Sequence, residues 1–171
     1  MFSKTDIENY FNAEKGESLL FIIIGVAAII LAIVFFFIIK SSWYKGAAIP
    51  FFVIGMMHLV VGYTVYNRSD ADRTRNVYAY DMNPAELKTK ELPRMEKVNR
   101  NFVVYRYIEI ALLVVGLVLI VLYRSQPDKN FWMGLGVALA IEAIISLGAD
   151  HFAEKRAKIY TEGLKNFVQK L

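Results

Sequence analysis

The 171-residue sequence contains no cysteine, two histidines and four prolines. Without cysteine the chain can form neither disulfide bonds nor thiolate nucleophiles, and it cannot build a sulfur-rich zinc or iron–sulfur site. It also lacks a Ser/His/Asp set, a glycine-rich phosphate loop, an HExxH motif and the histidine-rich motifs of membrane hydroxylases and desaturases. These absences disfavour an enzyme, and no catalytic residue, metal or cofactor is expected.

Charge is nearly absent from four long blocks in which the apolar residues of this 56% hydrophobic chain are concentrated: residues 18–39, 46–66, 107–123 and 131–148. About 20 apolar residues suffice for a helix to cross a hydrocarbon core of about 30 Å. The first block is apolar on all sides, which argues against a soluble helical bundle, and its length and acidic flank argue against a cleaved signal peptide. The sequence predicts an all-α integral membrane protein whose four transmembrane helices form a bundle of two in–out–in hairpins.

Lysine and arginine are shared unevenly among the segments outside these blocks. Four of the twenty lie in two short turns, at Lys40, Lys45, Arg124 and Lys129, and the other sixteen lie in the termini and the central segment. Because segments rich in positive charge stay cytoplasmic, both termini and the central segment are expected in the cytoplasm, and the protein in the cytoplasmic (inner or plasma) membrane. The net charge of +4 then needs no nucleic-acid partner, and the chain carries no nucleic-acid-binding motif.

The expected segments are residues 1–17, 18–66, 67–106, 107–148 and 149–171. The second and fourth are the two hairpins. The first is an N-terminal interfacial helix, the third a cytoplasmic loop with helices, and the last a cytoplasmic amphipathic helix.

The N-terminal segment predicts a short helix that begins with a capping box of Thr5 and Glu8 and stops at Gly16. A frayed end of the first span is an equally good interpretation. The tail predicts a helix that extends the fourth span, because its apolar residues recur near helical spacing. These residues are Phe152, Ile159, Tyr160, Leu164, Phe167, Val168 and Leu171.

In the central segment, Asn83 and Pro84 predict a helix start, with asparagine as the cap and proline in the first turn. Pro93 predicts an interruption, after which a helix from about Arg94 can run directly into the third span. One face of this extension is apolar and is expected to pack on a neighbouring helix.

Polar residues gather where the cytoplasmic ends of the spans are expected. Asp70 and Asp72 form a DxD pair, which is typical of cation or phosphate sites. However, Arg68, Arg73 and Arg75 lie at helical pairing distances, so a self-paired helix end is favoured. Three further polar residues belong to the same edge: Arg106, Asp150 and His151.

Three ionisable residues lie inside the apolar blocks, namely His58, Glu109 and Glu142. Each costs several kcal/mol in lipid unless it is paired, neutralised or hydrated. In a structural interpretation His58 and Glu142 hydrogen-bond each other, and Glu109 pairs with Arg106 one turn earlier or reaches the membrane interface. The same residue types also build proton or ion relays and metal sites, and these alternatives stay open.

Small residues recur at helical spacing on the sides of the spans that carry these ionisable groups. Such residues let helices approach closely in lipid, so these sides are expected to face the inside of the bundle. The expected packing residues are Gly25, Ala28, Ala32, Gly55, Gly62, Gly116, Gly134, Ala138 and Ser146.

The sequence leaves three classes of function open. The first is a non-catalytic polytopic membrane protein that acts in the lipid bilayer through helix–helix assembly, as a homo-oligomer or with a membrane-protein partner. An accessory subunit or an immunity-type protein would fit it. The second is a small oligomeric channel or a proton-coupled transporter that uses His58, Glu109 and Glu142. The third is a metal-dependent membrane enzyme, for which the sequence offers the least support.

Overall fold

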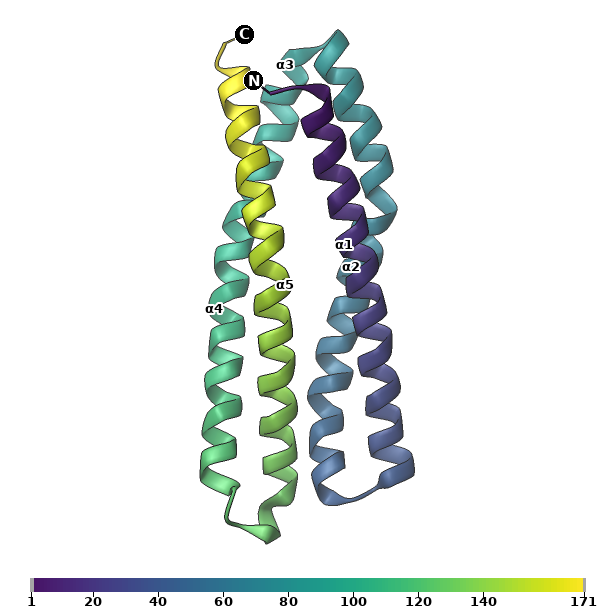
Figure 1. The fold of residues 1–171 in the computed structure, drawn as a ribbon, viewed down its shortest axis with the longest axis vertical. Helices are drawn as coiled ribbons and strands as arrows, with labels where there is room; N and C mark the ends of the chain where they lie inside the picture. The colour runs from purple at the N-terminus through teal and green to yellow at the C-terminus, as the bar shows by residue number, and fades with distance from the viewer. Residues whose placement is uncertain (1, 171) are drawn as a thin grey trace.

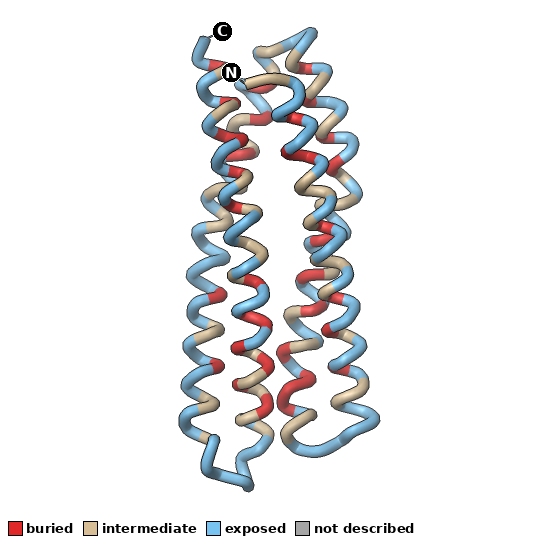
Figure 2. The backbone as a smooth tube through the Cα atoms, viewed as in Figure 1, coloured by how far each residue is buried: buried red, intermediate tan, exposed pale blue. Residues whose placement is uncertain are grey.

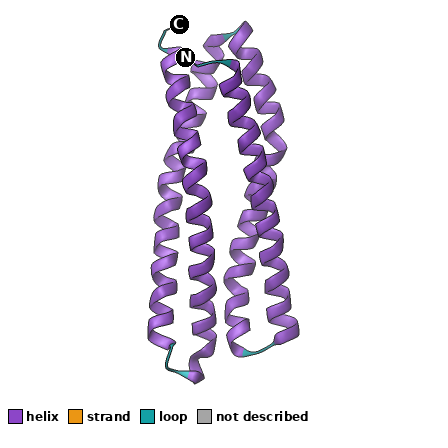
Figure 3. Ribbon diagram, viewed as in Figure 1, coloured by secondary structure: helices purple, strands orange, loops and turns teal. Residues whose placement is uncertain are grey.

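The structure is a computed structural model that describes residues 2–170, so the expected tail residue Leu171 lies outside the described part. The chain is 94% helical, and residues 2–170 contain no strand (Figure 3). The elements are α1 (Lys4–Ile33), the π-helical turn η1 (Val34–Ile39), α2 (Ser42–Met82), α3 (Pro84–Glu86), the π-helical turn η2 (Leu87–Glu91), α4 (Leu92–Tyr123), the 3-10 turn η3 (Pro127–Lys129) and α5 (Asn130–Val168).

The long helices run side by side along the long axis of the molecule (Figure 1). Both chain ends and α3 lie at one end, the terminal end, and the short α1–α2 and α4–α5 links lie at the other, the turn end. Helix α1 packs mainly on α2 and α4 on α5, while α2 also packs on α5 and α1 scarcely touches α4. Four helical segments are long and apolar enough to cross a membrane, which confirms this part of the expected fold.

Helix α1 begins earlier than expected and does not stop at Gly16. Ser3 caps it: its hydroxyl accepts a hydrogen bond from the Asp6 backbone N–H, and its own N–H donates to the Asp6 carboxylate at 2.8 Å. The expected capping box at Thr5 is therefore wrong. A glycine costs a helix only about 1 kcal/mol, too little to end a helix whose following residues continue into an apolar span.

Between α2 and α4 the chain reverses direction through α3 and η2. The expected helix start at Pro84 is confirmed, although the Asn83 side chain makes no capping hydrogen bond. Pro93 lies in the first turn of α4 rather than in a break. Proline has no N–H, and its ring crowds the carbonyl four residues earlier. The wider π-helical turn that precedes it, in which Leu92 N–H bonds to Leu87 O, accommodates the ring.

Glycines set the distances between the long helices. A Cβ on Gly25 would lie 2.6 Å from Gly55 O, and one on Gly116 would lie 2.8 Å from Gly136 O. Both helix pairs therefore meet backbone to backbone. The two pairs meet each other near the turn end, where a Cβ on Gly46 would lie 1.9 Å from Phe131 O. Only small residues permit such an approach.

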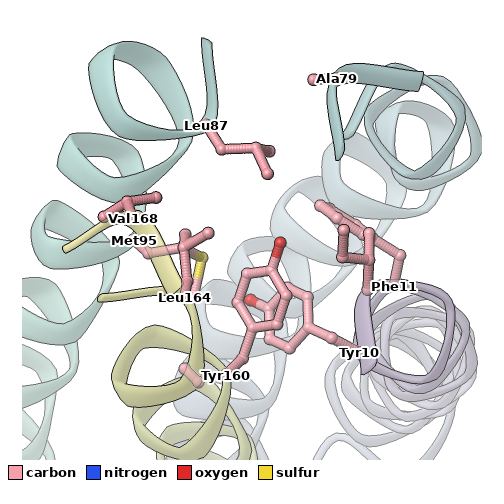
Figure 4. Close-up of a cluster of buried hydrophobic side chains, with 10 residues drawn as sticks. Tyr10, Phe11, Ala79, Leu87, Met95, Tyr160, Leu164 and Val168 are labelled. Atoms are coloured by element: carbon pink, nitrogen blue, oxygen red, sulfur yellow. The ribbon is translucent and has the colours of Figure 1, made fainter. Parts of the chain in front are cut away.

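A compact apolar core fills the terminal end (Figure 4). Ile7 and Phe11 of α1, Leu87 of η2, Met95 of α4 and Leu164 of α5 are all buried in it. The expected packing of the α4 extension on its neighbours is thus found. In the middle of the bundle buried residues form thin stripes, and the outer faces of the helices are exposed (Figure 2), as expected of helices surrounded by lipid.

Candidate functional site

A cavity of about 440 Å³ lies between the two helix pairs, with walls from α1, α2, α4 and α5. It exists because the pairs are joined at both ends and, between them, mainly along α2 and α5, where His58 meets Ser146. Glycine contacts join α2 to α5 near the turn end. Near the terminal end the Tyr10 and Tyr160 rings stack with their centroids 4.2 Å apart. Helix α4 scarcely touches α1 or α2, so the cavity is not closed along α4.

His58 of α2 is buried beside this cavity. Its Nε2 lies 3.0 Å from Ser146 Oγ of α5, and no residue within 2–170 makes a hydrogen bond with its Nδ1. The Phe21 ring packs edge-on against the imidazole, with ring centroids 5.2 Å apart. The expected hydrogen bond between His58 and Glu142 is therefore wrong. Ser146 takes that place because its short side chain faces α2 where the two helices pack.

Glu109 of α4 and Asp150 of α5 are the acidic groups in the middle of the cavity wall. Glu109 is buried, and its carboxyl group lies within hydrogen-bonding reach of the Asp150 carboxyl, while no basic or neutral donor within residues 2–170 reaches its Oε2. The expected pair of Glu109 with Arg106 is wrong, because Arg106 forms its ion pair with Glu154 of α5. Arg106 and Glu109 lie one turn apart on α4 and face successive acids of α5, Glu154 and Asp150.

Glu142 of α5 is the most enclosed of the three ionisable residues. Its side chain is 1% exposed, and within residues 2–170 its Oε2 accepts no hydrogen bond and no basic group lies within ion-pair distance. It does not line the 440 Å³ cavity, although its neighbours Ala143 and Ser146 on α5 do. Glu142 therefore faces protein, as the small-residue pattern predicts, but without the histidine it was expected to meet.

Two ion pairs close the terminal end of the cavity. Arg68 of α2 reaches Glu14 of α1 at 3.4 Å, and Arg156 of α5 binds both carboxylate oxygens of Glu17 of α1. Sequence reasoning did not single out Glu14, Glu17 or Arg156. Their signal is weak, because the acids lie among the mixed charges that precede the first span, and only the approach of α5 to α1 brings Arg156 near them.

The DxD pair is engaged by basic side chains, as its arginine-rich surroundings predict. Asp72 is held by Arg75 at 2.9 Å and by Arg68 at 3.7 Å. Asp70 is exposed and pairs with Arg73 of the same helix and with Lys15 of α1. The hydrogen bond from the Lys15 ammonium lowers the pKa of the Asp70 carboxyl.

A second buried polar group lies in the apolar core of the terminal end. Glu91 of η2 accepts hydrogen bonds from Arg94 at 2.6 and 2.9 Å and from the Tyr160 hydroxyl at 3.4 Å. The Arg94 guanidinium lies over the Phe11 ring, 5.4 Å from its centroid. Burial raises the pKa of Tyr160 and of the neighbouring Tyr10 above their ordinary values. This group ties α4 to α5 and α1, and no sequence motif pointed to it.

The remaining residues singled out in the sequence fall into two sets. His151 is exposed and does not line the cavity. The nine expected packing residues are all buried, and Gly46 and Gly136 make equally close helix contacts that sequence reasoning missed. Within residues 2–170 no three histidine and acidic side chains come together as a metal site would require.

The described site is thus an amphipathic cavity between two helix pairs. Its terminal end carries charged groups, its middle carries His58 and two acids, and the end toward the turns is apolar. Such an arrangement can bind and orient a molecule with a polar head and an apolar body. No family model, curated protein or solved structure matches this chain.

Proposed function

We propose that the chain is a non-catalytic protein of the cytoplasmic membrane that acts through helix–helix assembly on its cytoplasmic side. In this topology α1 with α2, and α4 with α5, form two in–out–in hairpins, and the terminal end lies in the cytoplasm. The distribution of basic residues supports this orientation, because only four of the twenty lysines and arginines lie near the turn end.

The observation that carries the proposal is the folded head at the terminal end. Helix α2 continues for about 24 Å beyond its apolar block and α5 for about 30 Å, at a rise of about 1.5 Å per residue. The head buries its own core of Ile7, Phe11, Leu87, Met95 and Leu164. Such a head gives the chain a folded surface beyond the apolar blocks on which a partner could bind.

The head also leaves large apolar side chains uncovered. Tyr78 and Met82 lie one turn apart near the end of α2 and are 63% and 70% exposed, and Ile159 of α5 is 63% exposed. These residues are too far from the apolar blocks to be covered by lipid tails. We propose that they contact a second copy of the chain or a membrane-protein partner. Removing apolar side chains from water on association lowers the free energy.

A channel or proton-coupled transporter has less support. Both functions need polar groups along the whole path through the membrane. The ionisable residues of the apolar blocks all lie in the halves nearer the terminal end, and near the turn end the helix pairs meet at Gly46 and Gly134.

The proposal is tested by measuring the mass of the purified protein in mild detergent and in nanodiscs with light scattering. A homo-oligomer is expected to lose its assembled mass when Tyr78 and Met82 are replaced together by serine. For a different partner, a photo-crosslinking residue at position 78 or 82 is expected to yield one adduct of defined mass in native membranes. The matched control is the same crosslinker at Glu96, an exposed polar position on α4. The proposal would be contradicted by a protein that is monomeric and forms no protein adduct from position 78 or from position 82.

A further inference from the structure

The 440 Å³ cavity has a charge imbalance that points to the chemistry of a ligand. Of its charged wall residues, Arg68 is paired with Glu14 and Arg156 with Glu17. Glu109 and Asp150 remain, and neither takes part in an ion pair within residues 2–170. The base nearest to Glu109 along α4, Arg106, is engaged by Glu154. The cavity therefore has two acids that no basic side chain of the described chain neutralises.

Glu109 is oriented as a ligand-binding group would be. Its side chain is 9% exposed and lines the cavity, and within residues 2–170 its Oε2 has no hydrogen-bond donor. A proton shared with the neighbouring Asp150 carboxyl would leave one negative charge on the pair. A buried charge without a basic partner costs free energy, and a bound cation would recover it. The imidazole of His58, on the opposite wall, likewise has a free Nδ1.

The rest of the wall suits an organic cation better than a metal ion. Phe21, Phe102 and Tyr105 contribute aromatic rings, whose faces attract ammonium-type cations. Toward the turn end the wall is formed by apolar side chains such as Ile54, Met57 and Leu112, which offer nothing to a hydrated ion. The volume of about 440 Å³ lies in the range of small-molecule sites, about 300–1,000 Å³.

We propose that this cavity binds an amphiphilic organic cation, with its positive head against Glu109 and Asp150 and its apolar body toward Leu112. The ligand enters from the bilayer between α1 and α4, the two helices that scarcely touch. Both an amine-bearing lipid and a small lipophilic cation have this chemistry. The site does not depend on the proposed assembly, because Tyr78 and Met82 lie outside the cavity wall.

Equilibrium dialysis of the full-length protein in detergent micelles tests the site with tetraphenylphosphonium as the cation and triphenylphosphine oxide as a neutral compound of similar shape. The native protein is expected to bind the cation about tenfold more tightly than the neutral compound. Glu109→Gln and Asp150→Asn are each expected to weaken cation binding by about tenfold, which corresponds to about 1.4 kcal/mol. Glu162→Gln, which changes an exposed acid of α5, is the matched control and should bind as the native protein does.

Native mass spectrometry from nanodiscs separates the two sources of ligand. Retention of phosphatidylethanolamine over phosphatidylglycerol, lost in Glu109→Gln, would identify an amine lipid, whereas cation binding without lipid retention would identify a small lipophilic cation. Leu112→Trp, which fills the apolar end, is expected to lower binding of either ligand and keeps the test valid if an acid variant fails to fold. The proposal would be overturned if the protein bound the cation and the neutral compound equally well, or if the acid variants bound the cation as the native protein does. It would also be overturned if neither assay detected binding.

Discussion

Glu142 is a carboxyl group that the protein encloses without giving it a basic partner within residues 2–170. Both states of this carboxyl group destabilise the folded protein. The ionised form has lost its hydration, and the protonated form requires uptake of a proton, which costs free energy at neutral pH. Glu142→Gln keeps the shape of the side chain and removes this cost. We therefore expect it to stabilise the protein by about 1–3 kcal/mol, measured as a higher midpoint of thermal unfolding in detergent micelles at pH 8.

The control for this variant is Glu162→Gln on the same helix, where the acid is exposed and the midpoint should not change. A fall in the midpoint of Glu142→Gln would mean that the carboxylate makes a contact that an amide cannot replace. In that case the residue would serve the stability of the bundle rather than a function.

Tyr10 and Tyr160 predict a loss of stability at alkaline pH. Their pKa values are raised by burial, so the folded state holds both phenol protons more tightly than the unfolded state does. Their contribution is complete below the ordinary pKa of about 10 and is lost as the pH rises above it. Each tyrosine should steepen the fall in unfolding free energy by up to about 1.4 kcal/mol per pH unit. Unfolding of Tyr160→Phe from pH 8 to 11 should show a shallower fall than that of the native protein.

Tyr107→Phe is the matched control, because Tyr107 is exposed and its change should leave the slope as it is. Equal slopes for Tyr160→Phe and the native protein would contradict the assignment of the alkaline transition to the buried tyrosines.

The residues within the site differ in how far the sequence could identify them. His58, Glu109 and Glu142 could be singled out because an ionisable group among apolar residues is conspicuous, although their roles stay predictions. Their actual neighbours could not be inferred. His58 meets Ser146 and Arg106 meets Glu154, and both pairings depend on the rotation of one helix about its axis relative to another.

At the scale of the elements, helix contacts through glycine decide how the two pairs fit together. Gly46→Ala would place a Cβ 1.9 Å from Phe131 O of α5, and a backbone atom cannot move aside as a side chain tip can. We expect this variant to lower the unfolding free energy by about 1–3 kcal/mol or more, measured by thermal unfolding in detergent.

Gly148→Ala provides the control within α5, because a Cβ there meets nothing within 4 Å. It should leave stability unchanged or raise it by up to about 1 kcal/mol, since alanine favours a helix more than glycine does. Equal effects of the two variants would contradict a specific contact at Gly46.

At the scale of the whole molecule, the absence of cysteine allows the proposed orientation to be tested without background labelling. Ser125→Cys lies in the exposed α4–α5 link, and Asn166→Cys lies on an exposed position near the end of α5. A membrane-impermeant maleimide added to intact cells is expected to label the cysteine at 125 and not the one at 166. Permeabilised cells should label both, and the reverse pattern in intact cells would contradict a cytoplasmic head.

The sequence by itself determined the helical class, the four apolar stretches and the continuity of α4 and α5 beyond them. These features depend on composition and periodicity along the chain, which are local properties. It misjudged Gly16 and Thr5 because such a residue shifts helix stability by too little to override its neighbours. It misjudged Pro93 because the π-helical turn before α4 accommodates the proline ring.

Only the tertiary structure decided which faces meet, and therefore that a cavity lies between the helix pairs with Glu109 and Asp150 side by side in its wall. The physical reason is that helix contacts in a bundle are set by close packing between segments that lie far apart along the chain. A small rotation of one helix about its axis exchanges one buried partner for another. The residue pattern of a single helix does not determine this rotation.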